Sequence, residues 1–181
     1  LTARPRFADH SRETFLAALD TAEAIAAEKF ASHNRKADEH EPQFDGLRVS
    51  MIPEVKEALK AFIDAGFMAA AHDYELGGMQ LPVTMTQACF SLFKGANVST
   101  SGYPFLTIGN ANVIRRFGSA AQQEKYLKPL LAGRFFGTMA LTEPQAGSSL
   151  SDITTRAEPN PDGSYSITGN KIFISAGDHE L

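Results

Sequence analysis

Apolar residues recur at intervals of three or four positions from the N-terminus to about residue 133, the spacing that places side chains on one face of a helix. The first stripe consists of Phe15, Leu19, Ala22, Ala26 and Phe30. The second, after Pro53, consists of Val55, Leu59, Phe62, Ile63 and Gly66. The third, after Pro82, consists of Met85, Ala88, Cys89, Leu92, Phe93 and Ala96. Three amphipathic helices are therefore predicted, and Pro53 suits the first turn of the second.

A fourth helix is predicted between Pro104 and Phe117, but its pattern is less regular. Asn110 and Asn112 interrupt the apolar stripe. Because asparagine is a weak helix former, the sequence leaves the extent of this helix open.

The fifth predicted helix has a clear start. Ser119 and Gln122 have the spacing of a capping box, and Pro129 is expected to bend or end the helix before Gly133. Amphipathic helices joined by short connections pack as a bundle. We therefore predict a helical bundle domain over residues 1–133.

The pattern changes at Phe135, where aromatic, β-branched and small residues replace the helical stripes. The predicted strands are Phe135–Thr142 (buried), Thr154–Glu158, Tyr165–Thr168 and Lys171–Ser175. Asp162-Gly163 between the second and third is a strong hairpin signal, and Gly169-Asn170 marks another turn.

The fold class predicted from both patterns is α+β. The helical bundle is followed, over residues 134–181, by the first strands of an antiparallel β domain. The strand pattern stops in mid-sheet and leaves the last strand without a partner on one edge. A sheet of this size with an unpaired edge would have marginal stability by itself. We therefore expect a truncated β domain and a fragment of a longer protein.

Composition narrows the function. Of 181 residues, 43% are hydrophobic, which is typical of a globular protein, and the net charge of −4 disfavours nucleic-acid binding. No apolar run approaches the roughly 18 residues of a membrane span, and no leader is visible, so a cytoplasmic location is expected. The lone Cys89 is expected to fill the core. The histidines have no metal-ligand spacing and are expected to be structural: His10, His33, His40, His72 and His179.

One segment, residues 139–149, carries candidate chemistry. It leaves a predicted buried strand, turns at Pro144, and offers free backbone N–H groups around Gly147 with hydroxyls beside them. Such a turn can enclose the polar groups of a ligand. It can equally be a tight strand-exit loop whose hydroxyls bond their own backbone.

The same segment resembles the signature of the acyl-CoA dehydrogenase family. The similar motifs are Leu141-Thr142-Glu143-Pro144, Ala146-Gly147-Ser148 and the pattern over 162–175. Upstream, 74–78 and 117–133 agree as well, so the resemblance covers nearly the whole chain. Gln145, Phe173-Ile174-Ser175 and Gly177-Asp178-His179 are most similar to the 3-(methylthio)propanoyl-CoA dehydrogenase branch.

The resemblance implies a helical domain, a β domain and a C-terminal four-helix domain, the last absent here, with FAD between the last two. It implies α,β-dehydrogenation of an acyl-CoA, in which a base removes the α proton and the β hydrogen leaves as hydride to the flavin. By motif position, Met139, Leu141 and Thr142 are expected to contact the isoalloxazine. Gly147 and Ser148 are expected to face the flavin's chain, with Ser148 also binding the substrate's CoA.

Three further residues take the positions of the family's usual Trp-Ile-Thr: Phe173, Ile174 and Ser175. The resemblance implies that they cover one flavin face. Phe173 keeps a stacking surface without the indole N–H, and Ser175 keeps the hydroxyl. Ser149 stands where the family commonly has Asp, which places cofactor affinity in question.

The catalytic base is expected outside this chain, because the family's base is a glutamate of the C-terminal domain. Glu143 is expected to be structural. This chain alone is therefore expected to be inactive and to bind FAD weakly or not at all. The resemblance further implies an electron-transfer flavoprotein as oxidant and a homo-oligomer, in fatty acid metabolism.

Two alternatives stay open. One is an acyl-CoA oxidase or a flavin monooxygenase of the same fold. The intact Thr142-Glu143-Pro144 turn favours a dehydrogenase over a monooxygenase, and the choice between dehydrogenase and oxidase stays open. The other is a non-catalytic helical interaction module, which predicts a chain that is stable as it stands.

Overall fold

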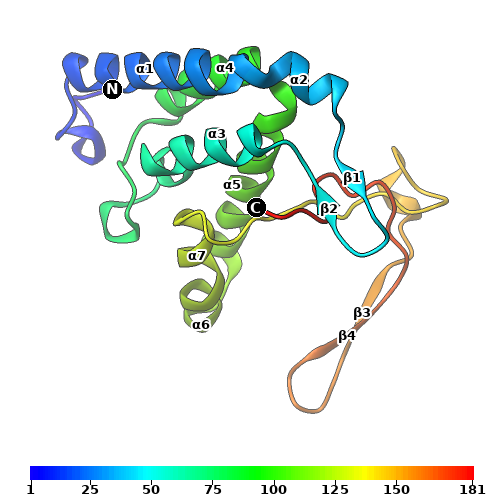
Figure 1. Cartoon of the computed structure of the whole chain (residues 1–181). Helices are drawn as coiled ribbons and strands as arrows, with labels where there is room; N and C mark the ends of the chain where they lie inside the picture. The colour runs from blue at the N-terminus through cyan, green and yellow to red at the C-terminus, as the bar shows by residue number, and fades with distance from the viewer. The chain divides into compact units, whose positions relative to one another are not determined.

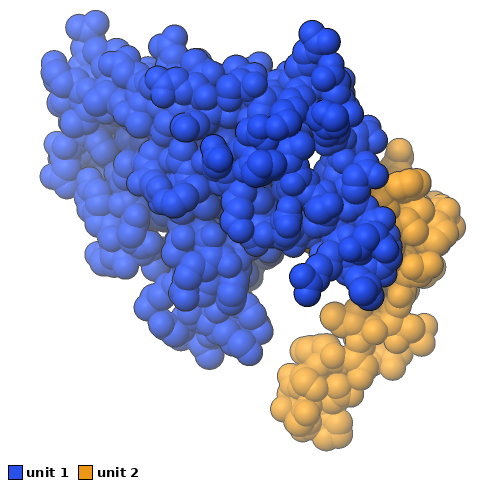
Figure 2. Space-filling model, in the orientation of Figure 1, with its two compact units in different colours: residues 1–137, 178–181 blue, residues 138–177 orange.

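The computed structural model describes all residues from Leu1 to Leu181 and divides them into two compact units. The helical unit comprises Leu1–Gly137 and Asp178–Leu181, and the β unit comprises Thr138–Gly177. Figure 2 shows the two in different colours. Helices in one unit and small antiparallel sheets in each confirm the α+β class.

The first apolar stripe lies on a helical rod that has four consecutive segments. Helix α1 (Arg12–Ile25) begins at Ser11, whose hydroxyl accepts from Thr14 N, and continues through a π-helical turn (Ala26–Phe30) and a 3-10 turn (Ala31–His33). Helix α2 (Asn34–Glu39) follows. Ala22, Ala26 and Phe30 are buried, so the stripe faces the core as predicted.

The second and third stripes form α3 (Pro53–Asp64) and α4 (Val83–Ala96), and both predictions are confirmed. Helix α4 lies alongside α1 (Figure 1). Their shared core contains a cluster of phenylalanine rings, with Phe93 centred 5.0 Å from Phe30 and 4.9 Å from Phe62. Cys89 is fully buried beside them, which confirms its predicted place in the core.

The fourth helix differs from the prediction. Helix α5 runs over Val98–Phe117, starts six residues before Pro104, and includes Asn110 and Asn112 without a break. Its start is set by Asn97, whose side-chain oxygen accepts from Thr100 N at 3.0 Å. Tertiary packing explains why the helix continues through Pro104 and Asn110, because it buries residues from Thr100 to Ala111 and this outweighs the weak propensity of asparagine.

The fifth helix is confirmed but segmented. The predicted capping box is present between Ser119 and Gln122, and α6 (Ala120–Gln122), a π-helical turn (Gln123–Leu127) and α7 (Lys128–Leu131) follow. Pro129 lies in the first turn of α7, and the helical path ends before Gly133, which has a φ of 67°. Shorter 3-10 turns occur at Pro5–Phe7, Phe67–Ala69 and Tyr74–Leu76.

A small hairpin in the helical unit was not predicted. Strands β1 (Gln43–Phe44) and β2 (Val49–Ser50) pair antiparallel. Between them Asp45 Oδ1 accepts from the backbone N–H groups of Leu47 and Arg48, both at 2.8 Å, and Gly46 has a φ of 100°. Asp45-Gly46 is the same turn signal that predicted the later hairpin.

In the β unit, β3 (Arg156–Pro159) and β4 (Tyr165–Thr168) pair antiparallel, with Arg156 opposite Thr168 and Pro159 opposite Tyr165. The predicted hairpin at Asp162-Gly163 is thereby confirmed. A 3-10 turn, Leu150–Asp152, precedes it.

Two predicted strands of this region are wrong. Phe135–Thr142 and Lys171–Ser175 form no ladder, and Met139 is 61% exposed rather than buried. A strand needs a continuous row of backbone partners, and these two segments share one such bond, from Ile172 N to Thr142 O at 2.9 Å. Phe173, with a φ of 57°, also leaves the extended conformation. The helices include none long and apolar enough to cross a membrane.

Candidate functional site

The candidate site is the turn that begins at Thr142 in the β unit. Glu143 and Ala146 close it with two backbone hydrogen bonds, Glu143 N to Ala146 O at 2.9 Å and Ala146 N to Glu143 O at 3.1 Å. Pro144 and Gln145 form its tip, where a proline at the second position presets the backbone angle of the turn. The turn is therefore a defined structure and not a loose connection.

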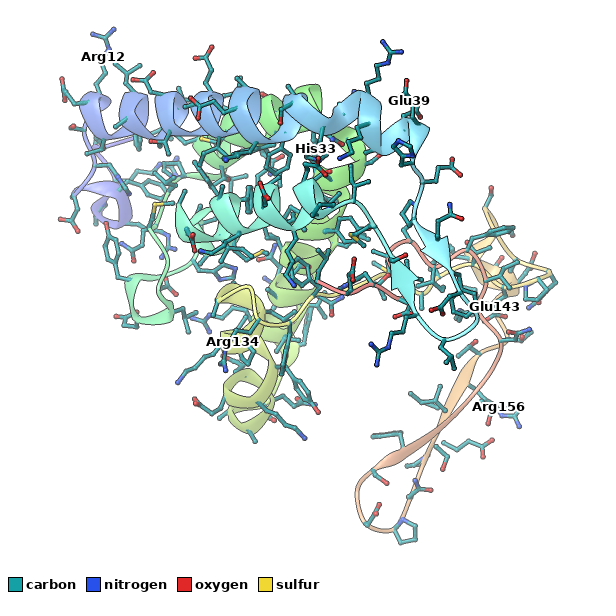
Figure 3. The ribbon with its side chains drawn as sticks, viewed as in Figure 1. Arg12, His33, Glu39, Arg134, Glu143 and Arg156 are labelled. Carbon is teal, nitrogen blue, oxygen red and sulfur yellow. The ribbon has the colours of Figure 1, made fainter.

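Glu143 is the anchor of this turn (Figure 3), and it is 2% exposed. Its Oε1 accepts from Lys171 Nζ at 2.8 Å, Thr155 N at 2.9 Å and the Thr155 hydroxyl at 2.5 Å. Its Oε2 accepts from Thr154 N at 2.8 Å, the Thr154 hydroxyl at 2.8 Å and Gln145 Nε2 at 2.6 Å. Both carboxylate oxygens are thus fully supplied with donors.

These donors fix the protonation state of Glu143. The Lys171 ammonium, the Thr155 hydroxyl and the Thr154 N–H hold the pKa of the carboxyl far below its ordinary value. A carboxylate that stays ionised at neutral pH and uses both oxygens is a poor acceptor for a substrate proton. The geometry therefore gives Glu143 a structural role, as the sequence led us to expect.

Lys171 joins two parts of the candidate site. Besides Glu143, its Nζ donates to Leu141 O at 2.9 Å. The next residue, Ile172, donates its N–H to Thr142 O. Residues 141–143 are therefore held to 171–172, which brings together the two motifs that carried the family resemblance.

The residues expected to bind a cofactor all belong to the β unit, and most are open to solvent. Met139, Leu141 and Phe173 are 61%, 39% and 86% exposed. Thr142 and Ile174 are half-buried, whereas Gly147, Ser148 and Ser175 are exposed. The Ser175 carbonyl accepts from the Thr138 hydroxyl. Exposed apolar side chains next to a polar turn form the kind of surface that a ligand covers.

The sequence analysis did not predict the four residues that donate to Glu143, which are Gln145, Thr154, Thr155 and Lys171. A signal for them existed, because a glutamate at the end of an apolar segment must find donors when it is buried. Lys171 is the cation within the second motif, and adjacent threonines can supply two N–H groups and two hydroxyls. What the sequence did not show is which donors fold back onto Glu143.

Comparison with known proteins shows which protein family this chain belongs to. The family described as the acyl-CoA dehydrogenase N-terminal domain matches residues 12–134. The chain therefore belongs to the acyl-CoA dehydrogenase family, which confirms the resemblance.

Individual relatives agree with this class. The chain is 38% identical over 165 residues to 3-methylmercaptopropionyl-CoA dehydrogenase of Ruegeria pomeroyi, covering 91% of this chain and 28% of that protein. It is 34% identical to a broad-specificity linear acyl-CoA dehydrogenase of Mycobacterium tuberculosis, covering 98% and 27%. Butyryl-CoA dehydrogenase of Megasphaera elsdenii superposes with a TM-score of 0.76 at 27% identity, over 93% of this chain and 42% of that one. The chain thus spans less than a third of these two curated relatives.

Proposed function

We propose that this chain is the N-terminal part of an FAD-dependent acyl-CoA dehydrogenase, which converts an acyl-CoA to the α,β-unsaturated enoyl-CoA. In this proposal residues 1–133 are the helical domain and residues 134–181 begin the β domain. The observation that carries it is the turn at 141–148, held by the buried Glu143 and its six donors. The residues expected to meet the flavin lie within and beside this turn.

The residues present suit a flavin ring in their chemistry. Met139, Leu141 and Phe173 offer exposed apolar surface for a flat ring system, and the hydroxyls of Thr142 and Ser175 can donate to its polar edge. A Cβ built on Gly147 would meet only Thr142 Cγ2, at 4.0 Å, so the backbone is open to close approach by a ligand. Ser148 follows it and would bind the flavin's chain and the CoA of the substrate.

Bound FAD would supply the two-electron oxidation. The chain's own residues would orient the ring and exclude water from one face, through Phe173 and Ile174. Donors at the turn would stabilise negative charge that gathers on the reduced ring. Glu143 would keep these donors in place, because it ties Thr142 to Lys171. The base that removes the α proton would come from residues outside this chain.

We further propose a short acyl-CoA as substrate, with 3-methylmercaptopropionyl-CoA as the first candidate. The support is the 38% identity to the Ruegeria pomeroyi enzyme together with Gln145 and the Phe173-Ile174-Ser175 variant. An electron-transfer flavoprotein is proposed as the oxidant, and a homo-oligomer as the working form.

The test is an anaerobic visible spectrum of the full-length protein, recorded before and after adding 3-methylmercaptopropionyl-CoA, butyryl-CoA or octanoyl-CoA. We expect a flavin spectrum that bleaches with the short thioesters and not with free CoA. Bleaching that reverses rapidly in air, with peroxide formed, would move the proposal to an acyl-CoA oxidase. A flavin that no thioester bleaches would reject the dehydrogenase, and a protein without flavin would leave a non-catalytic member of the fold. The 181-residue chain alone is expected to show no turnover.

A further inference from the structure

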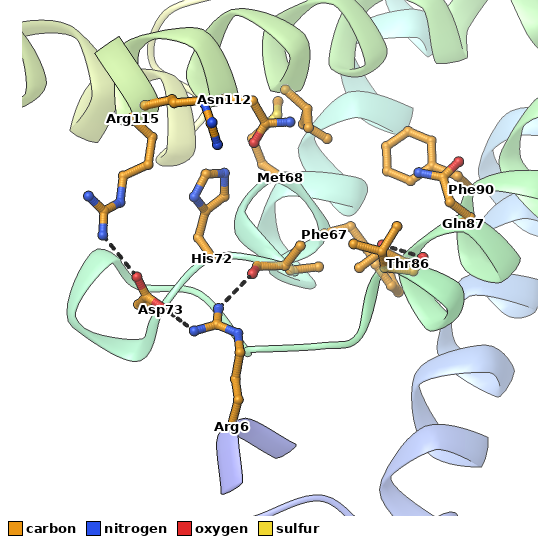
Figure 4. Close-up of a pocket in the computed structure, with 15 residues that line it drawn as sticks. Arg6, Phe67, Met68, His72, Asp73, Thr86, Gln87, Phe90, Asn112 and Arg115 are labelled. Atoms are coloured by element: carbon orange, nitrogen blue, oxygen red, sulfur yellow. Dashed lines mark hydrogen bonds and ion pairs between the residues drawn. The ribbon is translucent and has the colours of Figure 1, made fainter. Parts of the chain in front are cut away.

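The helical unit contains a pocket of about 540 Å³ that shares no residue with the candidate functional site. Its wall is built by the loop that follows α3, by α4 and α5, and by Arg6 from the N-terminal turn. This volume lies within the range of sites that hold small organic molecules. Figure 4 shows the side chains that line it.

The pocket has two chemically different walls. The apolar wall consists of Phe67, Met68, Val83, Phe90 and Ile108. The polar wall consists of Arg6, His72, Asp73, Asn112, Arg115 and Arg116, and Thr86 and Gln87 add uncharged polar side chains beside Phe90. In Figure 4, Phe90 lies at one end of the pocket, and Arg115 and Asp73 lie at the other. A ligand that fills it must therefore combine a hydrocarbon part with a polar group.

The polar wall carries an excess of positive charge. Asp73 lies between two guanidinium groups, with Oδ1 2.5 Å from Arg6 and Oδ2 3.2 Å from Arg115. One carboxylate thus faces two cations. Arg116 adds a third cation. Its guanidinium carbon lies 5.5 Å from the centroid of the Phe117 ring, so this arginine contacts an aromatic ring and not a carboxylate. His72 adds no charge at neutral pH, since burial lowers its pKa. The polar group of a ligand should therefore be an anion.

His72 contributes a buried polar atom without a protein partner to the lining of this pocket. The residue is 8% exposed, and its Nε2 is buried without a hydrogen-bond partner. Buried polar atoms are nearly always hydrogen-bonded. Figure 4 shows the imidazole turned toward Asn112 and Arg115, which is the cationic end of the pocket.

The backbone that carries His72 is firmly held. Gln80 N donates to His72 O at 3.0 Å, and Leu81 N donates to Ala70 O at 2.8 Å. A Cβ on Gly78 would lie 2.1 Å from His72 O, so only glycine permits this close approach. The unpartnered nitrogen is thus a feature of a fixed loop.

We propose that this pocket binds an amphipathic carboxylate, an organic acid whose carboxylate lies between Arg115 and Arg116 beside His72 and whose hydrocarbon part packs on Phe90 and Ile108. Arginine suits this role because its planar fork of N–H donors matches a carboxylate. An inorganic anion would leave the apolar wall unused, and a neutral lipid would leave the excess positive charge of the three arginines over Asp73 unbalanced. The site stands apart from the proposed function, and either can fail without the other.

The test uses octanoate as the probe, titrated calorimetrically into the 181-residue chain. Acetate carries the charge without the hydrocarbon, 1-octanol the hydrocarbon without the charge, and inorganic phosphate a different anion. We expect saturable binding of octanoate, and at least tenfold weaker binding of each of the other three. Arg116→Ala is expected to weaken octanoate binding about tenfold, whereas Arg134→Ala, an exposed arginine outside the pocket, should leave it unchanged.

A second pair of variants tests the apolar wall without touching the core. Val83 is 68% exposed at the start of α4, and Val98 is 70% exposed at the start of α5, outside the pocket. An aspartate suits the first turn of either helix, so both variants should fold. Val83→Asp should weaken octanoate binding by charge repulsion, and Val98→Asp should not. Equal octanoate binding by each variant and its control, octanol binding as tight as octanoate, or no octanoate binding at all would each overturn the proposal.

Discussion

Lys171 Nζ lies 2.8 Å from Glu143 Oε1, and this ion pair connects the turn at 141–148 to the segment at 171–175. The Glu143 side chain is 1% exposed and that of Lys171 is 21% exposed. Four donors from Thr154 and Thr155, together with Gln145 Nε2, complete the set of donors to the carboxylate. The pair therefore holds two separate segments of the β unit together, and the only sheet of this unit is the hairpin of β3 and β4.

The first prediction concerns the removal of this cation by Lys171→Met. The variant leaves Glu143 with a buried charge whose strongest partner is gone, and it releases Leu141 O. We expect amide exchange at Ile172, whose N–H bonds Thr142 O, to accelerate about tenfold or more. The measurement is hydrogen exchange followed by NMR.

The control for that variant is Lys60→Met. Lys60 forms an exposed ion pair with Asp64 within α3, and such pairs contribute little to stability. It should leave the exchange rate of Ile172 unchanged. Similar rates in Lys171→Met and the unmodified chain would show that the turn does not depend on the ion pair.

The second prediction concerns pH. The pKa of Glu143 is strongly lowered in the folded chain from its ordinary value of 4.5, mainly by Lys171. In acid, Glu143 therefore becomes protonated in the unfolded chain at a pH at which it is still ionised in the folded β unit. The stabilisation is complete above pH 4.5 and declines as pH falls below this value toward the folded pKa.

Glu143→Gln should remove this dependence. We expect the variant to be less stable than the unmodified chain at pH 7, and the difference to shrink between pH 4.5 and pH 2.5. Hydrogen exchange or chemical denaturation at both ends of this range measures it. A difference that stays constant with pH would mean that Glu143 titrates normally in the folded chain.

Helical segments with regular apolar stripes could be predicted from the sequence, because a stripe such as Val55, Leu59 and Phe62 indicates which face of the helix packs against the core. The start of α5 could not. Pro104 looks like a boundary when read alone, but the helix gains its stability from packing and from the cap at Asn97. Local signals describe propensity, and tertiary contacts decide the extent of an element.

The β unit shows a different limit. The hairpin of β3 and β4 depends on local turn chemistry and was predicted, whereas Phe135–Thr142 has strand composition but finds no continuous partner. In the site, the motif residues could be named from the sequence. The donors around Glu143 could not, because Thr154, Thr155 and Lys171 reach it from 11 to 28 residues away.

The third prediction concerns the two hydrogen bonds of the Asn97 side chain at the start of α5. The side chain of Asn97 both caps this helix and donates from Nδ2 to Phe30 O at 3.2 Å. Asn97→Ala loses both bonds, and Asn97→Ser keeps a capping oxygen but loses the donor. We expect Asn97→Ala to lower the free energy of unfolding by about 1–3 kcal/mol, which combines the cap with an orphaned buried carbonyl. In urea denaturation the stability of Asn97→Ser should lie between those of Asn97→Ala and the unmodified chain. Equal stability of the two variants would show that the capping hydrogen bond does not stabilise the helix.

The last prediction concerns the aromatic core. Phe62 is fully buried in α3, and its ring contacts those of Phe30, Phe67, Phe90 and Phe93, with centroids 4.9 to 6.4 Å away. Phe62→Ala would leave a cavity that these rings cannot fill without disturbing one another. We expect a loss of about 3–5 kcal/mol in the free energy of unfolding of the helical unit.

Phe117→Ala is the matched control, because Phe117 is 75% exposed at the end of α5. It should change the same free energy by less than about 0.5 kcal/mol, as surface substitutions usually do. Urea denaturation monitored by circular dichroism measures both variants, since the helices belong to the unit that contains both residues. A comparable loss in the two variants would mean that the ring cluster around Phe62 is not the centre of stability, and that the exposed end of α5 is covered in solution.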